Sequence, residues 1–135
     1  MAMNAVVASE GVGLFFYPDF YTTFDPVGEE LGLRHNPFNV YDANAIELWT
    51  TIDEDGGDEP KQVGFLPRAL AALLAPLVRV NPAFRMHAVI SGPVISPPKR
   101  CPLEVHMTFP TEMAAQVSAT PLKGPQVNPL WAAGA

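Results

Sequence analysis

Short runs of β-branched and aromatic residues recur along the chain, each bounded by glycine, proline or acidic residues. Runs of this kind are typical of β-strands joined by turns. Where residues alternate in polarity, as in residues 45–52, one face of the strand should pack on a core. We therefore predict short strands over residues 12–17, 30–34, 45–52, 62–65, 84–90 and 103–109.

Two segments have helical rather than strand character. Apolar residues at positions 66, 70, 73, 74 and 77 share one face of a helix, which Pro67 can start and which Pro76 should end or kink. A second, short helix is predicted over residues 113–119, and residues 121–135 are predicted to form a tail. Several strands with one or two helices predict a mainly β protein, built as a small barrel or β-roll.

The length of 135 residues suits a single domain with one core. No apolar run reaches the roughly 20 residues that cross a bilayer. The first residues have neither the basic start nor the long apolar centre of a signal peptide. We therefore expect a soluble, non-secreted protein with no membrane partner. Cys101 is the only cysteine, which excludes an internal disulfide and fits a reducing compartment.

The formal net charge of −6 is unevenly distributed along the chain. Residues 1–60 carry twelve of the fourteen carboxylates and only Arg34 among the basic residues, so their net charge is −11. Residues 61–135 carry the other seven Lys and Arg and have a net charge of +5. An anionic ligand should therefore approach the second part. The acidic segment 53–59 is predicted to be a solvated turn, and its spacing does not match a calcium-binding loop.

The most informative polar segment is residues 33–46, which read L-R-H-N-P-F-N-V-Y-D-A-N-A-I. An Asn-Pro step predicts a turn, and Asn39 can take a positive φ or hydrogen-bond to its own backbone. An exposed Tyr41 beside Asp42 could stack on a flat group and hydrogen-bond to a hydroxyl or amide next to it, as nucleotide binding requires. The same pattern also fits an ordinary capped turn, with Tyr41 packed inward and Asp42 bonded to neighbouring amides.

Arg68 lies in the first turn of the predicted helix and away from its apolar face. Unpaired backbone amides and the positive end of the helix dipole are in the same turn, so arginine and helix could hold one phosphate together. A solvated arginine is the alternative interpretation. The sequence contains no phosphate-loop or nucleophile motif, and its three histidines lack metal-ligand spacing with Cys101. We therefore expect a non-catalytic protein without a metal or cofactor.

Four segments occur in an order and spacing that resemble a known domain: V-G-L-F-F-Y at 12–17, residues 33–46, Q-V-G-F-L-P-R-A-L-A at 62–71 and P-L-E-V-H-M-T-F at 102–109. Together, over residues 10–110, they resemble the HIRAN domain, found at the N-terminus of helicase-like transcription factor and other Rad5-type SWI2/SNF2 ATPases. The pattern N-P-x-N-x-Y-D-x-N-A-I is the specific part. The resemblance implies a modified OB-like β-barrel that binds the 3′-hydroxyl end of single-stranded DNA. The predicted short helix and Pro-rich tail, residues 111–135, follow this domain.

The resemblance also implies roles for individual residues. Asn39, Tyr41 and Asp42 match the end-binding residues of the family, with Tyr41 stacking on the terminal base and Asp42 contacting the terminal hydroxyl. Phe16 stands where the family has a tyrosine that stacks on the other side of that base, and Arg68 stands where it has a phosphate-binding lysine. The expected DNA-binding residues are Phe16, Tyr17, Asn39, Tyr41, Asp42 and Arg68.

Three departures from the family pattern would weaken DNA binding. Phe15 replaces a basic residue, the Pro-rich loop before Cys101 has no counterpart of a further base-contacting phenylalanine, and the acidic segment 53–59 is long. Two functions are therefore expected as alternatives. One is capture of DNA 3′ ends in repair or stalled-fork remodelling, with a SWI2/SNF2-type ATPase or another repair protein as partner. The other is a HIRAN-fold protein-interaction domain with weak or no DNA binding. A nuclear location is expected in a eukaryote, and a cytoplasmic one otherwise.

Overall fold

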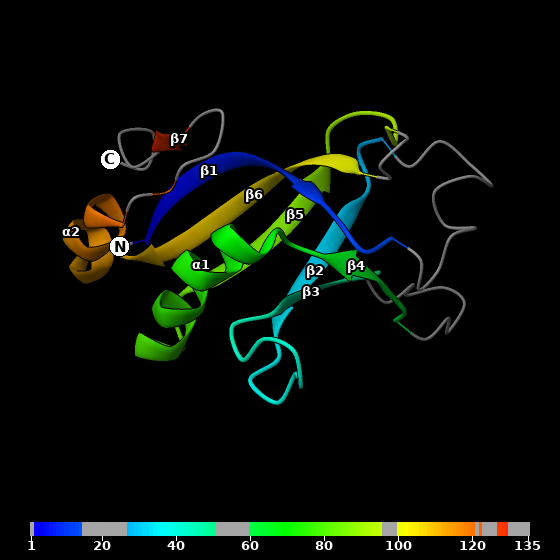
Figure 1. Ribbon diagram of the computed structural model, residues 1–135. Coiled ribbons are helices and arrows are strands. Elements are labelled where there is room, and N and C mark those ends of the chain that lie inside the picture. Colours follow the sequence, from blue (N-terminus) through cyan, green and yellow to red (C-terminus); the bar gives the residue numbers. More distant parts are fainter. Residues whose placement is uncertain are drawn as a thin grey trace.

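The computed structural model describes residues 2–14, 27–50, 60–95, 100–120 and 122, together with the backbone of residues 127–129. Within these residues the chain forms one antiparallel sheet with two α-helices (Figure 1). The strands are β1 (Ala2–Gly11), β2 (Glu30–His35), β3 (Ile46–Thr50), β4 (Gln62–Phe65), β5 (Arg85–Ile90), β6 (Cys101–Pro110) and β7 (Val127–Pro129). Their order across the sheet is β4-β3-β2-β5-β6-β1-β7. The prediction of a mainly β protein with one or two helices is confirmed.

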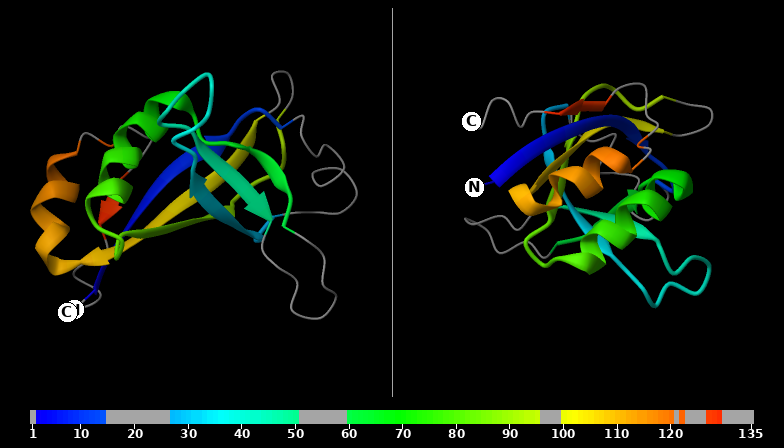
Figure 2. Two further views of the ribbon diagram at one scale, coloured as in Figure 1. Left: turned by 90° about the horizontal axis from the view of Figure 1, so that it is seen from below. Right: turned by 90° about the vertical axis from the view of Figure 1, so that its left-hand side faces the viewer.

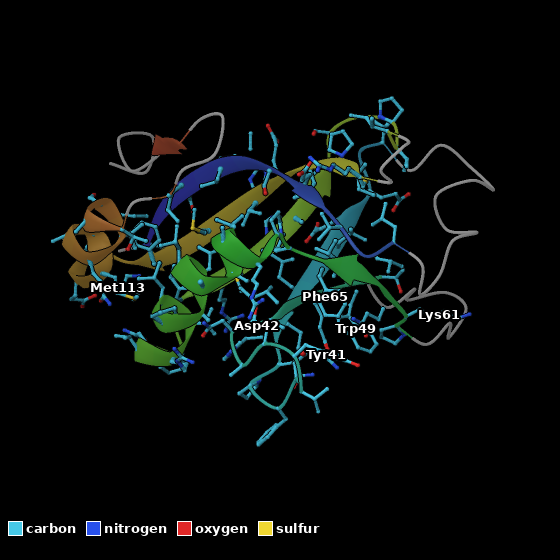
Figure 3. All side chains as sticks on the ribbon, in the orientation of Figure 1. Tyr41, Asp42, Trp49, Lys61, Phe65 and Met113 are labelled. Carbon is cyan, nitrogen blue, oxygen red and sulfur yellow. The ribbon has the colours of Figure 1, made fainter. Side chains whose placement is uncertain are left out.

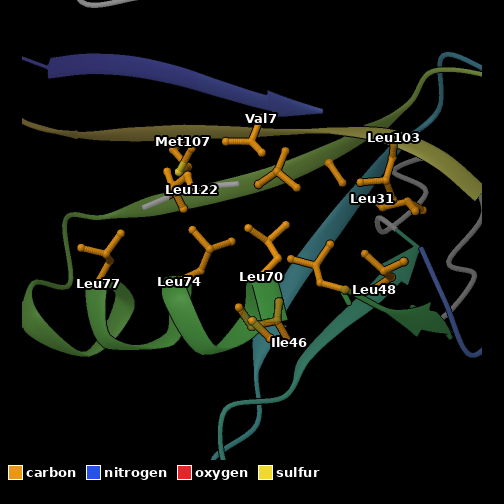
Figure 4. Packing of buried hydrophobic residues seen from close by; sticks show 14 of the residues in the cluster. Val7, Leu31, Ile46, Leu48, Leu70, Leu74, Leu77, Leu103, Met107 and Leu122 are labelled. Carbon is orange, nitrogen blue, oxygen red and sulfur yellow. The ribbon is translucent and has the colours of Figure 1, made fainter. Parts of the chain in front are cut away.

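The inner face of the sheet forms the core. In β6, every second side chain from Cys101 to Phe109 is buried and the intervening ones are partly exposed. This alternation is that of a strand with one face on a core. β6 pairs along its whole length with β1, from Ala2 opposite Pro110 to Gly11 opposite Cys101. The two long strands therefore form the longest ladder of the sheet, and Figure 4 shows buried residues that pack between the strands and the helix below.

The helix α1 (Arg68–Val80) packs across this inner face, as the views in Figure 2 and Figure 4 show. Leu70, Leu74 and Leu77 are buried against the strands, on the face that the apolar spacing predicted. Pro76 was predicted to end or kink the helix, and the first alternative is wrong, since α1 continues to Val80. Pro76 is exposed while Leu77 is buried, so packing of the following residue outweighs the backbone hydrogen bond that proline cannot make.

A short second helix, α2 (Ala114–Ala119), follows β6 after a 3-10 turn at Thr111–Met113, close to the prediction. Two described parts of the segment predicted as a tail contribute to the fold. Leu122 is buried in the core, and β7 pairs with β1. In the part of the chain that is described, no helix is long and apolar enough to span a bilayer.

The first strand begins earlier than predicted. β1 ends at Gly11, Val12 forms only an isolated bridge, and Gly13 turns the chain with a φ of 64°. Residues 15–17 of the predicted strand lie outside the described residues. Half of the residues of β1 are alanine, serine or glycine, so its own sequence gives little indication of a strand, and its pairing with β6 defines it.

The sheet is not closed into a barrel, because β4 and β7 remain its edge strands. One bridge nevertheless joins the chain after β1 to β4: the amides of Val12 and Phe65 each donate to the other residue's carbonyl oxygen, both at 2.8 Å. Gly64 permits this approach, because a Cβ at residue 64 would lie 2.8 Å from the Val12 carbonyl oxygen. Val12 and Phe65, the two residues of this bridge, both lie at the candidate site.

Candidate functional site

The loop over residues 36–44, between β2 and β3, is held by three local turns. In each turn an Asn or Asp side-chain oxygen accepts a backbone N–H two or three residues later: Asn36 Oδ1 at 3.0 Å, Asn39 Oδ1 at 2.9 and 3.0 Å, and Asp42 Oδ1 at 2.9 Å. Such side-chain bonds replace part of the missing strand ladder and restrict the loop. For Asn39, either a positive φ or a hydrogen bond to its own backbone was predicted. No described non-glycine residue has a positive φ, so the hydrogen-bonded alternative is the one observed.

This loop faces the start of α1 across an open pocket of about 270 Å³. Four polar residues line it: Asn39, Tyr41 and Asp42 from the loop, and Arg68 from the helix. The remaining lining is apolar and comes from Val12, Ala45, Phe65, Leu66 and Ala71. Figure 3 labels Tyr41, Asp42 and Phe65 around it. Four of the six predicted site residues therefore share one pocket, whereas Phe16 and Tyr17 lie outside the described residues.

Tyr41 presents its ring to solvent, with 88% of the residue exposed. The interpretation in which Tyr41 packs inward is therefore wrong. A ring displayed in this way, on a loop with fixed backbone, offers a π-face at the mouth of the pocket. Asp42 does hydrogen-bond to a neighbouring amide, that of Asn44, but only through Oδ1. Its other oxygen remains available for a second contact.

The second oxygen of Asp42, Oδ2, faces Arg68. Arg68 is the first residue of α1, and Pro67 before it supplies no side-chain cap to the helix amides. The interpretation of Arg68 as simply solvated is incomplete, because the exposed guanidinium is paired with Asp42. The pocket thus combines an acceptor suited to a hydroxyl with a cation and a helix start suited to a phosphate.

Glu47 on β3 supports the loop through Asn36, and it was not identified from the sequence. It is the only charged residue in the described part of the chain that is buried, at 7% exposed. Its Oε2 accepts from Asn36 Nδ2 at 3.0 Å and its Oε1 accepts from Trp49 Nε1 at 2.9 Å. The sequence feature that could have identified Glu47 is its carboxylate inside the otherwise apolar run I-E-L-W. The apolar lining by Val12 and Phe65 had no such signal, because the two residues are far apart in the chain.

The described cysteine and two of the histidines lie outside the pocket lining. Burial raises the pKa of the Cys101 thiol from 9.0 to about 11, which disfavours the reactive thiolate form. The rings of His87 and His106 stack at 5.0 Å between the neighbouring strands β5 and β6. Over residues 2–14, 27–50, 60–95 and 100–120, no group of three His, Cys, Asp or Glu could hold a metal ion.

Comparison with known sequences identifies a family and a curated relative. A family model for the HIRAN domain matches residues 5–113. A putative SWI/SNF-related matrix-associated actin-dependent regulator of chromatin, subfamily A member 3-like 1, from Arabidopsis thaliana is 32% identical over 96 residues. The alignment covers 71% of this chain and 10% of that protein. The chain therefore spans about a tenth of the length of the curated relative it matches.

Solved structures show the same architecture. The crystal structure of the HIRAN domain of human HLTF has a TM-score of 0.63 at 24% identity, covering 88% of each chain. The NMR structure of the HLTF HIRAN domain in its DNA-bound conformation has a TM-score of 0.59 at 25% identity, covering 87% of this chain and 86% of that one. A Lactobacillus plantarum protein has a TM-score of 0.60 at 20% identity, covering 82% of this chain and all of the other.

Proposed function

Because the chain belongs to the HIRAN domain family, as its sequence resemblance predicted, we propose that it is a non-catalytic module that captures the free 3′-hydroxyl end of single-stranded DNA. The relative solved in a DNA-bound conformation supports nucleic-acid binding. The observation that carries the finer proposal is the arrangement of Asn39, Tyr41, Asp42 and Arg68 around one open pocket. Its volume of about 270 Å³ is close to the lower end of ligand-binding cavities, which suits one terminal nucleotide.

Each pocket residue has a proposed contact with that nucleotide. Tyr41 stacks on the last base, which needs no particular base identity. Asp42 Oδ2 accepts the terminal O–H, while Oδ1 stays on the backbone of its own loop. Arg68 and the amides at the start of α1 contact the phosphate that precedes the last nucleotide. We propose that Phe16 and Tyr17 complete the stacking on the other side of the base.

End selection follows from the charge of Asp42. A free 3′-hydroxyl offers a donor to the carboxylate, and a hydrogen bond to a charged acceptor contributes about 1.5–3 kcal/mol. A 3′-phosphate, or a strand that continues, brings a negative charge to the same place. Arg68 offsets part of that repulsion, but it is expected to be engaged by the preceding phosphate.

The test compares three labelled oligonucleotides of one sequence at one salt concentration: a 3′-hydroxyl strand, a 3′-phosphate strand and a circular strand. We expect the 3′-hydroxyl strand to bind at least about tenfold more tightly, as the strength of the charged hydrogen bond implies. Asp42→Asn should narrow the difference in affinity between the 3′-hydroxyl and 3′-phosphate strands, because it removes the negative charge that repels the phosphate. Asp42→Ala should abolish that difference. Equal binding of all three strands by the wild-type protein would rule out end capture.

A protein-interaction domain is the second candidate. It is favoured by Phe38 and Val40, which are each 88% exposed on the same loop, and by the net charge of −6. Both features suit a protein surface better than a phosphate backbone. A folded wild-type protein that binds none of the three oligonucleotides would favour this function over DNA binding.

We extend the proposal to the cellular role with the curated relative as support. A module of this kind would deliver DNA ends to a SWI2/SNF2-type ATPase or another repair protein, at stalled replication forks or during repair. The nucleus is the proposed location in a eukaryote, and the cytoplasm otherwise. Co-purification of the protein with such an ATPase from its own cells, lost on deletion of the domain, tests this role.

A further inference from the structure

Glu47 is a buried charge that lies beside the pocket without lining it. It is on β3, with 7% of the residue exposed and both carboxylate oxygens hydrogen-bonded. A buried carboxylate is costly to desolvate, and an apolar residue would fill the same place in a strand at lower cost. We infer that Glu47 is a positioning residue, which fixes the 36–44 loop through Asn36 and needs two acceptor oxygens to do so. Its effect on DNA binding rests on the proposed function.

The first donor to Glu47 comes from Asn36, at the start of the loop. Asn36 uses every polar group it has: its amide donates to Ala45 O at 2.9 Å and its carbonyl accepts from Asn39 N at 3.2 Å. Its side-chain oxygen accepts from Phe38 N at 3.0 Å, and its side-chain nitrogen donates to Glu47 at 3.0 Å. The Asn36 carboxamide therefore cannot turn over without losing its bond to the loop backbone or its bond to Glu47.

The second donor to Glu47 comes from Trp49, two residues further along β3. The indole Nε1–H can only donate, and it reaches Glu47 Oε1 at 2.9 Å. The ring is held in place by Arg34, whose guanidinium carbon lies 4.4 Å from the ring centroid. Arg34 is also the cross-strand partner of Glu47 in the β2–β3 register. Two fixed donors thus meet the two oxygens of one side chain.

This arrangement makes a specific distinction between Glu and Gln. A glutamine at this position has one acceptor oxygen and one NH₂ donor, so whichever way it turns, one N–H faces another N–H. If the NH₂ group faces Asn36, the loop loses its support. Removing the indole donor as well, by Trp49→Phe, frees one side, so that the introduced amide can direct its oxygen to Asn36.

The experiment is a double-mutant cycle of Glu47→Gln and Trp49→Phe, with Glu104→Gln as the control. Glu104 is a partly exposed carboxylate on β6, and its Oε1 lies 3.3 Å from His106 Nε2. Glu47→Gln should weaken binding of the 3′-hydroxyl oligonucleotide by about tenfold, the effect of one unsatisfied buried donor. The double variant should recover to within about twofold of Trp49→Phe alone, so that the two changes are strongly non-additive. Glu104→Gln should leave the affinity unchanged.

A second readout needs no DNA: the backbone amide resonances of Phe38, Tyr41 and Asp42. They should move in Glu47→Gln and return in the double variant. If they do so while the wild-type protein binds no oligonucleotide, the positioning role stands and the proposed function fails. If the wild-type protein binds and Glu47→Gln changes neither resonances nor affinity, the inference is overturned. Should Glu47→Gln fail to fold, a folded double variant with wild-type loop resonances supports the inference, and an unfolded one overturns it.

Discussion

Arg68 Nε lies 3.6 Å from Asp42 Oδ2 at the pocket, and the two side chains differ in exposure, at 80% for Arg68 and 19% for Asp42. An ion pair with one partner so exposed contributes at most about 1 kcal/mol. Arg68 can therefore leave Asp42 for a phosphate at small cost. We predict that Arg68→Ala changes the free energy of unfolding by less than about 1 kcal/mol.

The same variant should lower the dependence of DNA binding on salt. If Arg68 neutralises one phosphate, the slope of log K against log salt becomes shallower by about 0.7 in Arg68→Ala. Arg79→Ala, at the other end of α1, is the matched control and should keep the wild-type slope. With only one to three phosphates neutralised, the wild-type slope itself should be shallow, and a value several times steeper would indicate a basic track elsewhere.

Tyr41→Ala should remove one stacking platform, worth about 1–3 kcal/mol per base. Tyr41→Phe should retain most of the affinity because the π-face is kept. Phe38→Ala is a demanding control, since Phe38 is as exposed as Tyr41 and on the same loop but does not line the pocket. Fluorescence anisotropy with a short oligonucleotide measures all three. Equal losses in Tyr41→Ala and Phe38→Ala would mean that the pocket does not define the binding site.

Gly64→Ala should destabilise the fold by about 1–3 kcal/mol, the usual cost of overpacking. The new Cβ would lie 2.8 Å from the Val12 carbonyl oxygen and 3.0 Å from Leu14 Cδ2, so the chain would have to move. Gly32→Ala is the control, because its Cβ would approach nothing closer than the Trp49 carbonyl oxygen at 3.8 Å. Urea unfolding should separate the two variants, and equal stabilities would show that the close approach is unimportant.

We predict that the buried thiol of Cys101 lowers the free energy of unfolding at alkaline pH. Burial raises the pKa of its thiol from 9.0 to about 11, so the folded protein keeps a proton that the unfolded chain releases. This contribution is complete below pH 9 and is lost as pH rises from 9 to 11, at about 1.4 kcal/mol per pKa unit. Urea unfolding of wild type and Cys101→Ala across this range should give a steeper decline for wild type. Parallel curves would contradict the prediction.

Features held by local interactions could be predicted from the sequence. The Asn and Asp side chains of the 36–44 loop bond to amides two or three residues away, so residue type and spacing were enough. The apolar face of α1 was equally accessible, because Leu70, Leu74 and Leu77 repeat at helical spacing.

Features that depend on distant partners could not be predicted. β1 is defined by ten pairs with β6, not by its own small residues. The pairing of Asp42 with Arg68 requires the β2–β3 loop to meet the start of α1, which neither segment encodes alone. A glutamate in a strand is expected to face water. Glu47 is buried because Asn36 Nδ2 and Trp49 Nε1 donate to its two carboxylate oxygens.

The bridge between Val12 and Phe65 joins the edge strand β4 to the chain after β1 at the pocket itself. Both residues line the pocket, and the amide of each donates a hydrogen bond to the carbonyl oxygen of the other. Such a two-bond contact should open more often than the long β1–β6 ladder, and its amides should exchange with solvent on each opening. A ligand that binds only the closed form slows that exchange in proportion to its own saturation. The hydrogen-exchange rates of the Val12 and Phe65 amides should therefore report the fraction of pockets that hold a ligand.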